Sequence, residues 1–349
     1  MSSNSRNVSM DFFRGVMAVI VAIGHLLFWN GQTKIIPLSF VLAVDFFLVL
    51  SGFVLAGSVL SKKSMCSFTF AKKRYLRIAP VFFFASAVTV PIAIYISSPP
   101  LPNLSDIFRI VTISGIFPMN ARSPFIYPEP LGIAWTISAE LWVGIIFFPL
   151  IYFLKQSAEP LLFPILISFV TICFLVINIQ SPDFMNINYA KYYGFITYGL
   201  IRTLMDYSLG AIAFLYKDKL LNFKSNIMNS VVQISTLLIV VYLYCKIGYN
   251  RSNEIFAPML FMLLIISLSK KSGILNKLFS GRLGNFMGDI SYPSYMMHPL
   301  LIILFVHVMD LNITPVCIVL YTLSLLIISK MVNSFIEKPC LKLIQKQNN

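Results

Sequence analysis

Residues 10–29 read MDFFRGVMAVIVAIGHLLFW, an apolar stretch that also carries Arg14 and His25. About 20 apolar residues in a helix span the hydrocarbon core of a bilayer, so this stretch predicts a transmembrane helix. At about 100° per residue, the eleven-residue separation brings both polar side chains to one helix face, roughly 16 Å apart along the axis. Ionisable groups are costly inside a membrane and usually mark a functional site.

Each of these side chains also has a structural interpretation. Arg14 lies near the start of the segment and can extend to the membrane surface. His25 can be a hydrogen-bonded packing residue. The functional interpretation therefore requires other buried polar groups that converge on the same face.

The composition predicts an all-α integral membrane protein. The chain has 349 residues, of which 58% are hydrophobic and 11% charged, and its mean hydropathy is +0.81, whereas soluble proteins carry about 25% charged residues. We interpret 1–349 as a single transmembrane domain. The net charge of +14 does not indicate nucleic-acid binding, because the basic residues lie in short loops between apolar segments. The five cysteines show no metal-binding spacing, so no metal is expected.

Hydropathy and charge predict ten spans with both termini in the cytoplasm. An uncleaved first helix is expected, and 98–131 is the largest outward loop. Within that loop, 107–117 is predicted to be a re-entrant or interfacial helix, because an additional span there would reverse the charge asymmetry of every later loop. The predicted spans are 11–30, 38–60, 76–97, 132–154, 160–180, 195–216, 228–248, 255–269, 287–308 and 313–334.

The second predicted span contains an acidic residue, Asp45, in the apolar sequence VDFFLVLSGFVLAGS. Asp45 either belongs to a functional site or forms a structural ion pair with Arg14 or Arg202. Arg202 is followed four residues later by Asp206, a spacing that predicts a self-neutralising pair on one helix.

Two further charged features lie at opposite ends of their spans. Glu140 lies about two turns into the fourth span, in GIAWTISAELW, and either forms a structural pair or belongs to a site. The loop before the third span, FAKKRYLRIAPVFFF, is strongly basic, and contact with anionic lipid explains part of this charge. Arg74 and Arg77, three residues apart, are also suited to forked contacts with the phosphates of an anionic donor.

The ninth predicted span reads GDISYPSYMMHPLLI and concentrates polar groups on one face. Ser291, Tyr295 and His298 follow each other at i, i+4 and i+7. Pro293 and Pro299 are expected to bend this helix and to free backbone carbonyls. Histidines near carboxylates indicate acid–base chemistry. Gly-rich nucleotide loops, HExxH and GxSxG are absent from the sequence, which argues against ATP-driven transport, zinc proteolysis and serine hydrolysis.

Together these segments resemble the membrane-bound acyltransferases known as acyltransferase family 3. The resemblance covers almost the whole chain and rests on six motifs in the family's order. They are Arg14 with His25; Asp45, Phe46, Phe47, Ser51, Gly52 and Phe53; Arg74, Arg77, Ile78 and Pro80; Trp135, Thr136, Ile137 and Glu140; Ile290, Ser291, Tyr292, Tyr295 and His298; and the segment FIEKP at 335–339.

The resemblance implies O-acyl transfer, most often of acetyl, from a cytoplasmic acyl-CoA to a sugar hydroxyl. The acceptor would be a bacterial surface polysaccharide such as O-antigen or exopolysaccharide, and the enzyme would lie in the inner membrane. His25 would act as the general base, with Glu140 or Asp45 orienting its imidazole. Arg14 would stabilise charge on the donor or on the oxyanion.

The resemblance also implies how the donor is held. Arg74 and Arg77 would bind the phosphates of acetyl-CoA, which is a substrate and not a resident cofactor. Tyr295, His298 and Ser51 would line the channel for the donor or the acceptor. Apart from these substrates and the lipid bilayer no partner is implied, nucleic acid is not expected, and the oligomeric state stays open.

Other interpretations stay open at this point. The sequence does not distinguish direct transfer to the acceptor from transfer through a covalent acyl-histidine. Some relatives modify small molecules or lipids, and a proton-coupled transporter also carries intramembrane ionisable residues. The chain ends at Asn349, so it resembles the membrane-only members that lack a C-terminal hydrolase-like domain.

Overall fold

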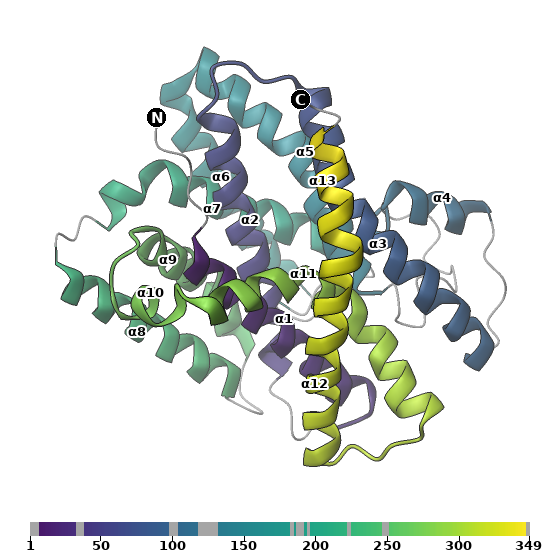
Figure 1. The fold of residues 1–349 in the computed structure, drawn as a ribbon. Coiled ribbons are helices and arrows are strands. Elements are labelled where there is room, and N and C mark those ends of the chain that lie inside the picture. The colour runs from purple at the N-terminus through teal and green to yellow at the C-terminus, as the bar shows by residue number, and fades with distance from the viewer. Residues whose placement is uncertain are drawn as a thin grey trace.

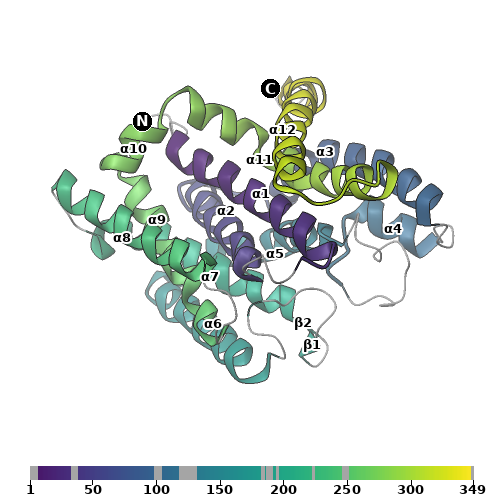
Figure 2. The same cartoon turned by 90° about the horizontal axis from the view of Figure 1, so that it is seen from below.

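The structure is a bundle of helices (Figures 1 and 2). The computed structural model describes residues 7–32, 38–97, 104–117, 132–181, 185, 192–193, 196–221, 225–245 and 251–346. The α-helices are α1 (Val8–Trp29), α2 (Ala43–Leu60), α3 (Ser67–Ser97), α4 (Leu104–Thr112), α5 (Ala134–Ser157), α6 (Glu159–Gln180), α7 (Tyr198–Leu220), α8 (Asn226–Cys245), α9 (Ala257–Ser269), α10 (Ile274–Phe279), α11 (Arg282–Ile302), α12 (Pro315–Val332) and α13 (Lys338–Lys346).

Shorter elements connect or extend these helices. Two 3₁₀ turns precede helices, η1 (Leu38–Leu42) and η2 (Arg251–Phe256), and two π-helical stretches follow them, η3 (Ile303–Val308) and η4 (Asn333–Glu337). The strands β1 (Tyr192–Tyr193) and β2 (Ile196–Thr197) form a small antiparallel ribbon.

The predicted all-α membrane fold is confirmed. Eight helical segments among the described residues are long and apolar enough to cross a bilayer. The two remaining predicted spans are also helical, as α7 and α9. Helix α7 contains Arg202 and Asp206, which lower its hydropathy, and the apolar segment Asn253–Ser269 is short.

Helices α1 and α11 run side by side in the same direction (Figure 2). Arg14 contacts Ser291 near their starts, and His25 contacts His298 near their ends. In the ten-span topology they are crossings one and nine, which must be parallel, whereas an additional span at 107–117 would make them antiparallel. The helix found there, α4, has nine residues and is about 13 Å long. It cannot cross a hydrocarbon core of about 30 Å.

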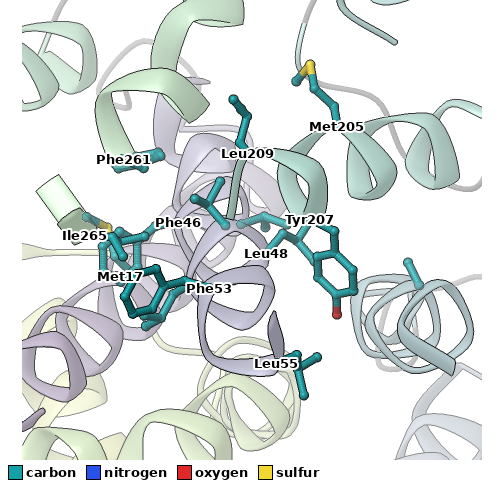
Figure 3. Close-up of a cluster of buried hydrophobic side chains, with 14 of the residues drawn as sticks. Met17, Phe46, Leu48, Phe53, Leu55, Met205, Tyr207, Leu209, Phe261 and Ile265 are labelled. Carbon is teal, nitrogen blue, oxygen red and sulfur yellow. The ribbon is translucent and has the colours of Figure 1, made fainter. Parts of the chain in front are cut away.

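Helix α2 forms the centre of the bundle and packs tightly against α7. A Cβ atom at Gly52 would lie 2.9 Å from the Tyr207 Cα, and one at Gly210 would overlap the Val49 carbonyl, so these glycines let the two backbones touch. Figure 3 shows the surrounding apolar cluster, in which Phe46 of α2 faces Phe261 of α9.

The structure corrects the start of the third span. The basic segment before 76 was predicted to be a loop, but α3 begins at Ser67 and carries these residues in its first turns. Most of the large outward loop, including 118–131, lies outside the described residues.

Candidate active site

The site is built around a pair of histidines. The His25 Nδ1 lies 2.9 Å from the His298 Nε2, and the two rings are parallel within 2°. His298 is fully buried, and its Nδ1 lies 2.7 Å from the backbone carbonyl of Tyr295. His25 is half-buried, and its Nε2 has no hydrogen-bond partner in the part of the chain that the structure describes. One nitrogen of His25 is therefore held, and the other is available to a substrate.

Aromatic rings enclose the His25 imidazole on its outer side. The Trp29 ring stacks on it with centroids 4.6 Å apart and an interplanar angle of 21°, and Phe40 meets it edge-on at 5.1 Å. Because an indole face attracts cations, this stacking would stabilise a protonated imidazole. Trp29 and Phe40 were not among the predicted site residues. Trp29 lies four residues after His25, and this spacing on one helix face is the signal that could have identified it.

Arg14 is fixed by α11 and does not simply extend to the membrane surface. Its Nε donates to the Ser291 hydroxyl at 2.8 Å, and its Nη2 donates to the Gly288 carbonyl at 3.1 Å. Asp11, one turn earlier, has Oδ1 3.4 Å from Nη2. The Arg14 side chain stays 30% exposed, so it remains accessible to a ligand. Arg14 and His25 thus lie about 16 Å apart along α1.

Glu140 binds an arginine and a serine, and not His25. Its Oε1 accepts hydrogen bonds from Arg74 Nη2 at 2.8 Å and from the Ser51 hydroxyl at 2.9 Å. The Tyr207 hydroxyl donates to the Glu140 backbone carbonyl. This cluster joins α2, α3, α5 and α7. The hypothesis that Glu140 orients the His25 imidazole is therefore wrong for this structure.

Arg74 and Arg77 differ in their surroundings, although they are one turn apart. The Arg74 side chain is 8% exposed and paired with Glu140, whereas Arg77 is exposed. The charges nearest to Arg77 are those of Arg74 and Arg14, which repel it, and of Glu140 and Glu337, which attract it. Of the two predicted phosphate-binding residues, Arg77 is the one that can contact a ligand directly. Arg74 is a buried packing residue paired with Glu140.

Asp45 forms the structural ion pair that the sequence left as an alternative. Its two oxygens accept from the Nε and Nη2 of Arg202 at 2.6 and 2.8 Å, and both side chains are at most 1% exposed. Arg202 Nη2 also donates to the Val41 carbonyl at 2.8 Å. The predicted pairing of Arg202 with Asp206 is replaced by this contact between α2 and α7. Asp45 contributes to the fold and does not contact His25.

Tyr295 connects the histidine pair to α5. Its hydroxyl lies 2.7 Å from the Thr136 hydroxyl and donates to the Ile133 carbonyl at 3.1 Å. Phe47 packs edge-on against its ring. With its side chain held in this way, Tyr295 meets His298 through its backbone carbonyl. Tyr295 is 5% exposed, and it therefore helps to fix the position of His298.

A separate surface cavity of about 570 Å³ lies at the N-terminal ends of α1, α8 and α10. Lys271 and Lys277 line it, but none of the nine predicted site residues does. Among the described residues, no three histidine, cysteine or acidic side chains are grouped to hold a metal ion. The cavity is therefore distinct from the predicted site residues.

Comparison with known proteins agrees with the motif pattern. The sequence profile of acyltransferase family 3, described as "Acyltransferase domain", matches residues 7–332. The chain belongs to acyltransferase family 3. This membership identifies a multi-pass membrane acyltransferase, in which the His25–His298 pair and the Arg14 cluster lie within the matched region.

One curated protein similar to this family member is "Protein 2 in picA locus" from Rhizobium radiobacter. The two are 33% identical over 115 residues, which cover 32% of this chain and 58% of the relative. The chain therefore matches a little over half of that protein's length. No solved structure matches this chain.

Proposed function

We propose that this acyltransferase is an O-acetyltransferase of the bacterial inner membrane. It moves acetyl from cytoplasmic acetyl-CoA to a hydroxyl group of a surface polysaccharide or of its lipid-linked precursor. The acetyl donor and the glycan acceptor follow from what the family resemblance implies. The geometry of α1 supports the proposal. It places Arg14, which with Arg77 forms a cationic cluster, about 16 Å from His25 along a predicted membrane span.

The cationic cluster suits the donor. Acetyl-CoA carries phosphates and does not cross a membrane, so it must approach from the cytoplasmic side, where positive residues concentrate. Arg77 is exposed there, and Arg14 keeps 30% of its side chain accessible. The guanidinium groups bind the phosphates, and the pantetheine arm extends along α1 to bring the thioester to His25.

The His25 Nε2 is the general base in this mechanism. The acceptor hydroxyl attacks the thioester carbonyl, an O–C bond forms, and the hydroxyl proton passes to Nε2. The C–S bond then breaks, and the His25 imidazolium returns the proton to the CoA thiolate. The single observation that carries this assignment is the asymmetry of His25, whose Nδ1 is held by His298 while its Nε2 binds none of the residues that the structure describes.

The test uses purified protein in lipid vesicles, acetyl-CoA labelled in the acetyl group, and a lipid-linked glycan fraction as acceptor. We expect base-labile label in the glycan from the natural protein. Transfer should fall by about 10²- to 10⁴-fold in His25→Ala, as for loss of a general base. His307→Ala is the matched control, since His307 is an exposed histidine at the outer end of the same bundle and should retain activity.

Two results would contradict the proposal. Undiminished transfer by His25→Ala would show that His25 is not the general base. Label that appears in membrane lipid or a small molecule, and never in glycan, would replace the acceptor while keeping the acyltransferase chemistry. Label that stays on the protein when acceptor is omitted, and needs His25, would instead indicate a covalent acyl-histidine step.

A further inference from the structure

Pro299, the residue after His298, explains why the Tyr295 backbone carbonyl can accept a hydrogen bond from the His298 side chain. In an α-helix each carbonyl accepts from the N–H four residues later. Pro299 lies four residues after Tyr295 and has no N–H. The Tyr295 carbonyl therefore has no helix donor, and the His298 Nδ1 occupies that role at 2.7 Å. In the sequence Tyr295-x-x-His298-Pro299, the proline thus leaves the Tyr295 carbonyl available as the hydrogen-bond acceptor for His298.

This contact determines where the protons lie on both rings. A carbonyl only accepts hydrogen bonds, so the His298 Nδ1 must carry a proton. In a neutral imidazole the other nitrogen is then an acceptor, and His298 Nε2 faces His25 Nδ1 at 2.9 Å. His25 must donate from Nδ1, which leaves its lone pair on Nε2. Both rings cannot be cations, because two N–H groups would then point at each other.

We propose that Pro299 and His298 are positioning residues that fix His25 in the tautomer with its lone pair on Nε2. Only the catalytic consequence of this assignment rests on the proposed function. His298 takes the place that a carboxylate has in a catalytic triad. As His25 Nε2 accepts the proton of the acceptor hydroxyl, the Nδ1 proton moves toward His298 Nε2, and the positive charge is shared by the two rings.

The surrounding contacts hold the pair in register. The Tyr321 hydroxyl lies 3.3 Å from the carbonyls of Ala22 on α1 and of His298 on α11, so it ties the two helices at the level of the histidines. Trp29 and Phe40 cover the His25 ring. The rings thus keep parallel planes, with centroids 5.1 Å apart.

The first test measures the tautomers and does not depend on activity. The chain has three histidines, so His307→Gln leaves only the pair in question. We would label this protein with ¹⁵N-histidine and record solid-state NMR spectra in lipid. We expect both imidazoles to be neutral and protonated on Nδ1. A resting population protonated on Nε2 at either ring would overturn the proposal.

The second test removes the proline. Pro299→Ala restores a backbone N–H that competes for the Tyr295 carbonyl, so the ¹⁵N signals should shift toward Nε2 protonation. We expect kcat to fall about 10- to 100-fold, as for loss of a group that orients a catalytic ligand, with KM for acetyl-CoA nearly unchanged. Pro293→Ala is the matched control, because Pro293 lies in the same helix but four residues after Asp289, whose side chain binds Lys330 and Lys338.

The third test replaces His298 itself. In His298→Gln the side-chain carbonyl can accept from His25 Nδ1 and preserve the tautomer, whereas His298→Leu cannot. We expect His298→Gln to retain at least about 10-fold more kcat than His298→Leu, since a wrong tautomer alone costs up to about 10⁴-fold in a triad. Equal kcat values for folded His298→Gln and His298→Leu would overturn the positioning role.

The outcomes separate this inference from the proposed function. If the tautomers are as expected but His25→Ala transfers acetyl normally, the base role fails while the proton positions stand. If His25→Ala is inactive but Pro299→Ala changes neither the ¹⁵N signals nor kcat, the proposed function stands and the role of Pro299 fails.

Discussion

Replacement of Asp45 tests whether this intramembrane carboxylate serves the fold or the chemistry. Asp45 makes two hydrogen bonds to Arg202, at 2.6 and 2.8 Å, and both side chains are buried. Hydrogen bonds to charged groups contribute about 1.5–3 kcal/mol each, so the two sum to about 3–6 kcal/mol. Removal of one partner of a buried ion pair costs about 3–5 kcal/mol. The two estimates agree.

We therefore expect Asp45→Ala to lower the apparent melting temperature by about 6–20 °C. A thermal shift assay in detergent measures this loss. Below the new transition, acetyl transfer per folded molecule should be close to that of the natural protein, because Asp45 does not contact the histidine pair. The double variant Asp45→Leu with Arg202→Met should recover most of the stability, since apolar replacement of a buried pair is often neutral.

The matched control is Asp218→Ala at the protein surface. Asp218 is 84% exposed and lies 3.7 Å from Lys270, and such exposed pairs contribute about 0–1 kcal/mol. An Asp45→Ala protein that melts like this control but has lost acetyl transfer would refute the structural assignment and restore a catalytic role.

Three further predictions follow from other contacts. Gly210→Ala should cost about 1–3 kcal/mol and lower the yield of folded protein, because the added methyl group would overlap the α2 backbone. Glu140→Gln weakens the 2.8 Å bond to Arg74 and should lower stability by about 1–3 kcal/mol and raise KM for acetyl-CoA; a fall in kcat as large as that of His25→Ala would contradict this. Hydrogen bonds with Thr69 lower the pKa of the Cys66 thiol, so in a variant lacking the other cysteines its thiolate should react with an impermeant maleimide at lower pH than an ordinary cysteine. Labelling should occur in inverted vesicles, and labelling of intact cells would contradict the predicted topology.

The sequence alone determined the membrane fold. In hydrocarbon every backbone polar group needs an internal partner, so apolar runs of about 20 residues can only be helices there. The charge in the loops then favoured ten spans over eleven, and the parallel orientation of α1 and α11 agrees with that number. Helical spacing placed Arg14 and His25 on one face of α1. It also placed Ser291 and His298 on one face of α11, and the contacts between the two helices confirm both placements.

Only the tertiary structure decided which polar groups meet. Helical spacing tells which face a side chain occupies, but not which of several distant helices packs there. Arg202 has Asp206 one turn away and still binds Asp45, 157 residues earlier in the chain. His25 binds a histidine 273 residues away, and not a carboxylate. The partner of a buried charge or imidazole is set by the packing of whole helices, because burial makes only close, well-aligned contacts favourable.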